Sequence, residues 1–163
     1  MRNIFKAVLL LAVMYVQPVT GWGEKAPGPK YKCMVQMTNY MGEGAYIVVS
    51  LVNSKKAYEK TLYVMGSDKK WYKNLEAWHA AFAKKPTDIS AITGASVAGG
   101  DRSVVVLDIE DAKINNGYTL RFETAVEDKK YYEKDLEIPL TAENMSAKTE
   151  GTGYIRYVRL SAN

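Results

Sequence analysis

Cysteine and histidine are almost absent from this chain of 163 residues, which contains one of each. A single cysteine can form neither an intrachain disulfide nor a cysteine-rich metal site. The single histidine, His79, follows Trp78 in a helical pattern and lies in no Gly-x-Ser-x-Gly nucleophile motif. We therefore expect no catalytic triad and no metal centre, and we expect that the protein is not an enzyme.

Two further kinds of binding motif are missing. Asp108, Glu110 and Asp111 cluster near the end of an expected strand, but the spacing of a calcium-binding loop does not follow. The small-residue run Val97-Ala98-Gly99-Gly100 lacks the Lys-Ser/Thr pair of a phosphate-binding P-loop. We interpret the first as a solvated strand end and the second as a turn.

Neither sign of charge dominates the sequence. Lys and Arg number 22 and Asp and Glu number 18, which gives a net charge of +4 at pH 7. Arg2 and Lys6 lie in a segment that we expect to be removed, and their loss lowers the charge to +2. Because no long Lys/Arg run remains, we expect no nucleic-acid partner.

Long hydrophobic runs are absent apart from residues 7–16, AVLLLAVMYV. Ten apolar residues are too few to cross a bilayer, which takes about 20. The basic start, the short apolar middle and the small residues at 19–21 are typical of a secretory signal peptide, residues 1–21. The alternative is a buried N-terminal helix. We expect a periplasmic or secreted protein whose mature chain begins near Trp22 and has no membrane span.

The rest of the chain has the composition of one globular domain, with 47% hydrophobic residues. After a Pro/Gly spacer (residues 22–29), apolar residues alternate with polar ones, a period typical of β-strands. This pattern predicts one domain, residues 30–163, built as a mainly β, Ig-like antiparallel sandwich. About seven strands are expected, at residues 31–37, 45–51, 58–65, 102–109, 118–123, 131–140 and 153–160.

One segment changes its period between the third and fourth of these strands. Trp71, Leu75, Trp78 and Phe82 recur at helical spacing, which predicts an amphipathic helix over residues 71–82. Ser67 or Asp68 precedes the expected helix as a possible cap, and Pro86 follows it. We expect this helix to pack over one end or edge of the sandwich.

The segment at residues 87–100 is a loop by composition and contains the tetrad Thr93-Gly94-Ala95-Ser96. The tetrad resembles the acceptor motif of extracytoplasmic flavin transferases, Asp-x-x-[Ser/Thr]-Gly-Ala-[Ser/Thr]. The resemblance implies that FMN is joined through its phosphate to Ser96. The motif's Asp position falls on Ser90, and the nearest acid, Asp88, lies two residues earlier. The alternative is a turn of small residues that leads into a strand.

The order of features also resembles a bacterial family of predicted periplasmic proteins, domain-of-unknown-function family 2271. The resembling pieces are residues 60–64, the helix with Trp71, Leu75 and Trp78, the Thr93–Ser96 loop and residues 116–123. The last piece is also similar to a hairpin of Ig-like domains in bacterial envelope proteins. The resemblance implies an Ig-like periplasmic domain whose relatives accompany membrane redox proteins and flavin transferases.

Two functions remain open at this point. In the first, the protein is an accessory of flavin-linked electron transfer, and FMN on Ser96 supplies the redox chemistry. Trp71, Tyr72 and Trp78 are then candidates for shielding the flavin ring. In the second, the domain carries no cofactor and serves as a structural or protein-binding module.

Overall fold

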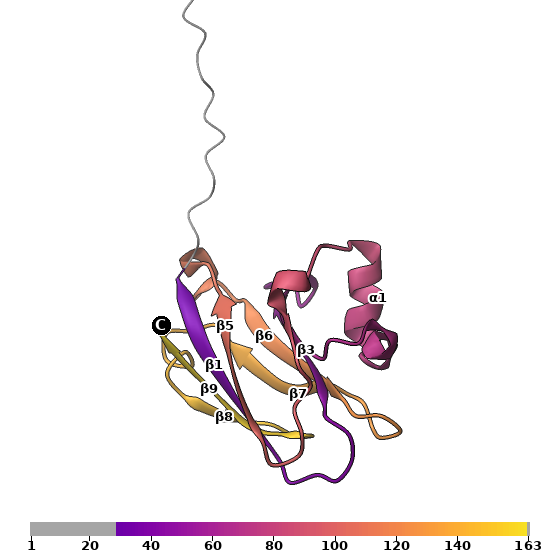
Figure 1. Cartoon of the computed structure of the whole chain (residues 1–163). Coiled ribbons are helices and arrows are strands. Elements are labelled where there is room, and N and C mark those ends of the chain that lie inside the picture. Colours follow the sequence, from indigo (N-terminus) through magenta and orange to yellow (C-terminus); the bar gives the residue numbers. More distant parts are fainter. Residues whose placement is uncertain (1–28, 163) are drawn as a thin grey trace, which may run out of the picture.

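Two β-sheets lie face to face in the computed structural model, which describes residues 29–162 (Figure 1). One sheet has four strands in the order β5-β1-β9-β8, and the other has five in the order β4-β3-β2-β6-β7. The strands are β1 (Lys30–Met37), β2 (Tyr46–Val52), β3 (Tyr58–Met65), β4 (Thr93–Gly94), β5 (Arg102–Asp108), β6 (Thr119–Ala125), β7 (Tyr132–Pro139), β8 (Lys148–Glu150) and β9 (Ile155–Ala162). The signal peptide expected at residues 1–21, and the spacer up to residue 28, lie outside the described residues.

The mainly β sandwich with one helix after the third strand is confirmed. All seven expected strands are present, and two short strands, β4 and β8, add to them. Neighbouring strands pair antiparallel, apart from β4, which runs parallel to β3. Strands this short leave almost no periodicity in the sequence, which explains why the pattern does not predict them.

The main core lies between the sheets and follows the alternation of the strands. Cys33 and Val35 of β1 belong to the same buried cluster as Ile47 of β2 and Phe122 of β6. Successive side chains of a strand point to opposite faces, so every second residue of these strands enters the core. The alternation of apolar and polar residues expected for these strands is therefore seen in the packing of the core.

The helical segment is divided in two, unlike the single helix that the spacing predicts. A 3₁₀ helix, η1 (Lys69–Asn74), ends at Leu75, and the α-helix α1 (Glu76–Lys84) follows. A 3₁₀ turn aligns residues three apart, and Tyr72 is thereby buried together with Leu75 and Trp78. Trp71, expected on the buried stripe, is left half-exposed.

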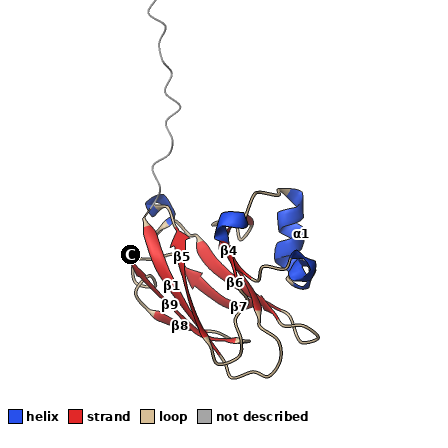
Figure 2. Cartoon of the chain, in the orientation of Figure 1, coloured by secondary structure: helices blue, strands red, loops and turns tan. Residues whose placement is uncertain are grey.

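α1 covers the outer face of the five-stranded sheet and does not lie at an end or edge of the sandwich (Figure 2). Its side chains pack with Val48 of β2, Val64 of β3 and Ala125 of β6, which point away from the main core. A sheet with apolar residues on both faces needs a cover on each side. The outward apolar positions of three adjacent strands therefore decide where the helix lies.

The first turn of α1 is capped by one side chain from β6 and one from the loop between β6 and β7. Leu75, which precedes the helix, makes no side-chain cap. Instead, the N–H of Ala77 donates to the Tyr131 hydroxyl at 3.0 Å, and the N–H of Trp78 donates to Glu123 Oε2 at 3.0 Å. These bonds satisfy two of the amide groups that a helix start leaves without internal partners.

Candidate functional site

The tetrad Thr93–Ser96 runs along the open edge of the five-stranded sheet. Its first two residues form β4, which pairs with Val64 and Met65 at the end of β3. The N–H of Gly66 donates to the carbonyl of Gly94 at 2.7 Å. One end of the tetrad is thus fixed to the sheet by backbone hydrogen bonds.

A second anchor lies immediately after Ser96. Val97 and Ala45 form an isolated antiparallel bridge, with N–H to carbonyl distances of 2.8 and 3.1 Å. The Tyr40 hydroxyl reinforces it, donating to the Val97 carbonyl at 2.6 Å and accepting from the Ala45 N–H at 2.7 Å. Ala95 and Ser96 are both exposed between the two anchors. Ala95 and Ser96 therefore form a short exposed segment, called the crest below, whose backbone is fixed at both ends.

Ser96 lines a cavity of about 140 Å³ between this crest and the 3₁₀ helix η1. The aromatic walls of the cavity are Trp71 and Tyr46, and its remaining lining residues are Glu43, Gly44, Asn74, Ala125 and Glu127. A side chain at Gly44 would place its Cβ 2.6 Å from Ser96 Oγ. Gly44 is therefore the position at which the lack of a side chain makes room for the Ser96 hydroxyl.

Ser96 also lines a second cavity, of about 220 Å³, toward strand β5. Gly94 and Ala95 line this cavity with it, as do Asp101 and Arg102. Ser96 thus lies between a cavity with aromatic walls and a second cavity that contains one acidic and one basic residue. Such a position leaves the hydroxyl accessible from solvent.

The other two residues of the proposed motif lie apart from the cavities. Thr93 is half-buried, and its hydroxyl donates to the Ile89 carbonyl at 2.8 Å. Asp88 accepts hydrogen bonds from Ser90 Oγ at 2.6 Å and from Ser90 N–H at 2.9 Å. These bonds, the side-chain one first, lower the pKa of Asp88. The carboxylate is thus held at Ser90, which occupies the motif's Asp position.

The structure also separates the three aromatic residues that the sequence offers as shields for a flavin ring. Trp71 lines the cavity next to Ser96, whereas Tyr72 and Trp78 are buried against the sheet. Tyr46 and Gly44 join the site without having been predicted. They reach the site because the turn between β1 and β2 folds back onto the tetrad. The sequence indicates a turn at this place but not where the turn packs.

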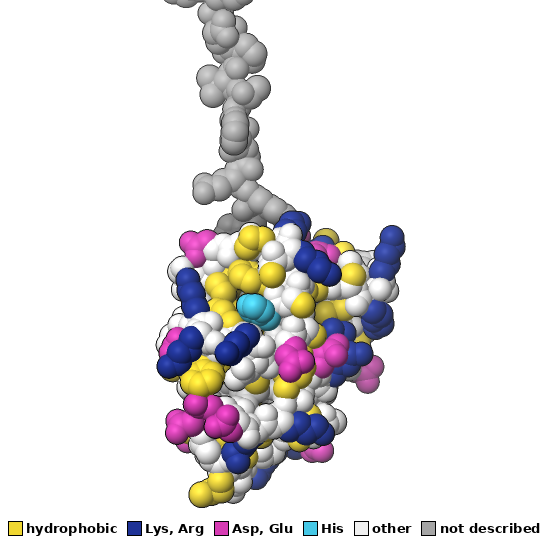
Figure 3. Space-filling view, turned by 90° about the vertical axis from the view of Figure 1, so that its right-hand side faces the viewer, with side chains coloured by type: hydrophobic (Ala, Val, Ile, Leu, Met, Phe, Trp, Pro, Cys, Tyr) yellow, Lys and Arg dark blue, Asp and Glu magenta, His cyan; other side chains and the backbone are white. Residues whose placement is uncertain are grey.

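The face that carries α1 includes the single histidine of the chain. His79 is exposed on α1, and hydrophobic, basic and acidic side chains all lie around it (Figure 3). Within residues 29–162, no group of three or more His, Cys, Asp and Glu residues is arranged to hold a metal ion. The exposed crest at Ser96 is therefore the candidate functional site.

The sequence profile of one protein family, DUF2271, matches residues 29–157, which is most of the chain. The protein belongs to the DUF2271 family of predicted periplasmic proteins. The periplasmic location expected from the N-terminal segment agrees with this family description. No curated protein and no solved structure matches the chain. In the described part of this DUF2271 protein, no helix is both long and apolar enough to cross a membrane.

Proposed function

We propose that this DUF2271 protein is a non-catalytic accessory of flavin-linked electron transfer in the periplasm, with FMN attached covalently to Ser96. The observation that carries the proposal is the exposed Ala95–Ser96 crest between two hydrogen-bonded anchors. An acceptor serine must enter the active site of another enzyme. A hydroxyl buried under the helix could not do so, whereas Ser96 is exposed.

The surroundings of Ser96 suit a flavin that lies mainly on the surface. Cavities that enclose drug-sized ligands measure about 300–1,000 Å³, and the aromatic cavity measures about 140 Å³. It therefore admits one edge of the ring against Trp71 and Tyr46. Arg102, whose Nε donates to Gln36, lines the second cavity together with Asp101 and offers a positive charge to the phosphate. An exposed flavin is open to electron exchange with a partner.

The attachment requires a flavin transferase and an activated donor, a nucleotide in which FMN is joined to a second phosphate by an anhydride. A bond forms between Ser96 Oγ and the FMN phosphorus, and the anhydride bond breaks. The second phosphate leaves with its nucleotide, and the hydroxyl proton passes to a base on the transferase. No electrons are transferred in this step. The bound FMN then supplies redox chemistry toward membrane redox proteins.

One observation favours a second candidate function, an Ig-like protein-binding module without a cofactor. Val104 and Val106 are 58% and 44% exposed on β5, the edge strand of the four-stranded sheet. Exposed apolar side chains on an unpaired edge are suited to adding a strand from a partner protein. In that case the tetrad is only part of a turn of small residues that leads into the next strand.

Labelling in cells distinguishes these two functions. The precursor is co-expressed with a periplasmic flavin transferase, and the product is examined by intact mass and visible absorption. We expect a yellow protein that carries one FMN. Ser96→Ala should abolish the label, and Ser96→Thr should retain it because a hydroxyl remains at the same position.

Ser67→Ala is the matched control, since Ser67 is exposed and lies outside the tetrad. It should label like the wild type. If the wild type stays colourless with unmodified mass while a known acceptor labels in the same cells, the flavin proposal is wrong and the binding module remains.

A further inference from the structure

A separate cavity of about 190 Å³ lies on the outer face of the five-stranded sheet, beside α1. It shares no lining residue with the two cavities at Ser96. It is lined by Ser50 and Val52 of β2, Tyr58 of β3, Ala77, Trp78 and Ala81 of α1, and Arg121 and Glu123 of β6. The cavity is thus bounded by the sheet below and by the helix at its side.

Ser50 is an unsatisfied polar group in this cavity. Its side chain is 1% exposed, and its Oγ is the one buried side-chain nitrogen or oxygen in residues 29–162 that has no hydrogen-bond partner. Buried hydroxyls in native proteins are nearly always bonded, and leaving one unbonded is costly. An unbonded hydroxyl that lines a cavity points to a ligand that completes the bond.

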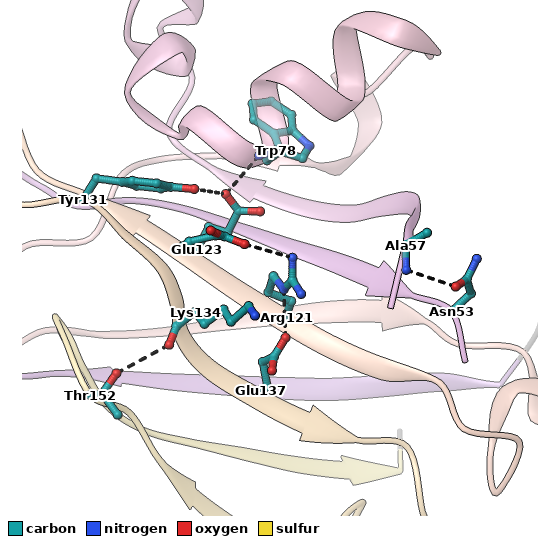
Figure 4. Close-up of polar contacts among 10 residues, drawn as sticks. Asn53, Ala57, Trp78, Arg121, Glu123, Tyr131, Lys134, Glu137 and Thr152 are labelled. Atoms are coloured by element: carbon teal, nitrogen blue, oxygen red, sulfur yellow. Dashed lines mark hydrogen bonds and ion pairs between the residues drawn. The ribbon is translucent and has the colours of Figure 1, made fainter. Parts of the chain in front are cut away.

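Glu123 is the second polar group of the cavity floor and is 2% exposed. The Trp78 N–H and the Tyr131 hydroxyl both bond to its Oε2, at 3.0 and 2.6 Å, and Oε1 is left for another partner (Figure 4). None of the ion pairs among the described side chains includes Glu123. Burial raises the pKa of this carboxyl, and the hydrogen bonds from Tyr131 and Trp78 and the nearby charge of Arg121 only partly oppose that shift.

Arg121 lines the same cavity, but its guanidinium is already engaged. Its Nε donates to Glu137 Oε1 at 2.8 Å (Figure 4). Its Nη1 lies 3.4 Å from Glu133 Oε1. Three carboxyl groups, counting Glu123, therefore surround a single cation. This imbalance favours a ligand with a positive charge.

Ser50 and Glu123 are close enough to share one small group. Ser50 pairs with Arg121 across β2 and β6, and Glu123 lies two residues farther along the same face. Diagonal neighbours of this kind have side chains about 7–8 Å apart at their bases, within reach of a bridging atom. An ammonium group offers three N–H donors and no acceptor, which matches a carboxylate oxygen and a free hydroxyl.

We propose that the cavity between α1 and the five-stranded sheet binds a small aliphatic primary ammonium, held by Glu123 Oε1 and Ser50 Oγ. The cavity volume of about 190 Å³ leaves room for a short alkyl chain. Val52, Ala77 and Ala81 supply the apolar wall for that chain. The site is independent of the flavin, because it contains none of the residues around Ser96.

The test is a titration of the ¹⁵N-labelled mature protein, without flavin, followed by two-dimensional NMR. n-Propylammonium chloride is the probe, and 1-propanol and sodium chloride are the controls. We expect saturable shifts of the Trp78 indole and Ser50 amide signals with propylammonium alone. Glu123→Gln keeps an oxygen that accepts from Trp78 and Tyr131, and it should weaken binding at least tenfold. Ser50→Ala should weaken it less.

Glu150→Gln is the matched control, since the Glu150 side chain is 75% exposed and lies on β8 of the other sheet. It should bind propylammonium nearly as the wild type does. Equal shifts with 1-propanol, or unchanged affinity in Glu123→Gln, would overturn the proposal. So would the absence of saturable shifts together with a crystal structure in which only a water molecule bridges Ser50 and Glu123.

An ammonium can also be carried by a lysine side chain of a partner, so the titration is repeated with Nα-acetyl-lysine methylamide. Tighter binding of propylammonium assigns the site to free amines. Tighter binding of the lysine derivative assigns it to a lysine-bearing partner. Either result supports an ammonium site. If neither compound binds, the proposal of an ammonium site is wrong.

Discussion

At the scale of single residues, the site of each side chain decides its chemistry more than its type does. Cys33 is fully buried between the sheets, and burial raises the pKa of its thiol from 9.0 to about 12. It therefore behaves as a small apolar residue and not as a nucleophile. Ser96, by contrast, is an ordinary serine made available only by its place on an exposed crest.

The buried thiol predicts a loss of stability at alkaline pH. The unfolded chain releases the thiol proton near pH 9.0, whereas the folded protein retains it up to about pH 12. The folded state then binds more protons, so the free energy of unfolding falls as pH rises through this window, by at most about 1.4 kcal/mol per pH unit. Urea unfolding of the wild type and Cys33→Ala at several pH values between about 8 and 11 measures the effect. The two curves should converge as pH rises, and parallel curves would contradict this account.

At the scale of elements, the attachment of α1 could not be predicted from its own sequence. The apolar spacing predicts a helix here, but not that it begins at Glu76 or that Glu123 and Tyr131 cap it. Those two residues lie about fifty positions later in the sequence. The local pattern places Glu123 on the polar face of one strand and Tyr131 at the start of the next strand. Similarly, β4 forms because β3 offers a free edge, which no local pattern encodes.

Tyr131→Phe tests the capping of α1 by the sheet. The substitution keeps the ring and removes the hydroxyl that accepts from Ala77 and donates to Glu123. We expect a loss of about 1–2 kcal/mol in the free energy of unfolding. Amide exchange at Ala77 and Trp78 should become faster, while exchange in β1 should change only with global stability.

Tyr132→Phe is the control for this change. Tyr132 packs against the main core, and none of the hydrogen bonds among the described residues uses its hydroxyl. A similar loss of stability in both variants would show that the Tyr131 hydroxyl does not anchor the helix.

At the scale of the whole molecule, one buried carboxylate joins the two sheets. Asp135 of β7, in the five-stranded sheet, is fully buried and accepts from the N–H groups of residues 152–155, which lead into β9 of the other sheet. Its Oδ2 also accepts from the Thr124 hydroxyl at 2.6 Å. Backbone amides here take the place of a counter-cation.

Asp135→Ala should therefore cost more than an ordinary polar substitution. It leaves several amide groups without acceptors inside the sandwich, each at about 1–3 kcal/mol, so we expect a loss of at least about 3 kcal/mol in chemical unfolding. Glu150→Ala, at a position where the side chain is 75% exposed, should change stability by less than about 0.5 kcal/mol. A loss below about 1 kcal/mol in Asp135→Ala would show that the loop at 152–155 finds other partners.

The sequence by itself determines the periplasmic location, the seven main strands and the tetrad at Thr93–Ser96, because each depends on local composition or short-period patterns. The tertiary structure alone decides that Ser96 is exposed beside Trp71 and Tyr46, and that Ser50 and Glu123 share a cavity. These features depend on which strands become neighbours and on which face the helix covers. Such long-range contacts are set by the burial of apolar surface over the whole chain, and local periodicity does not record them.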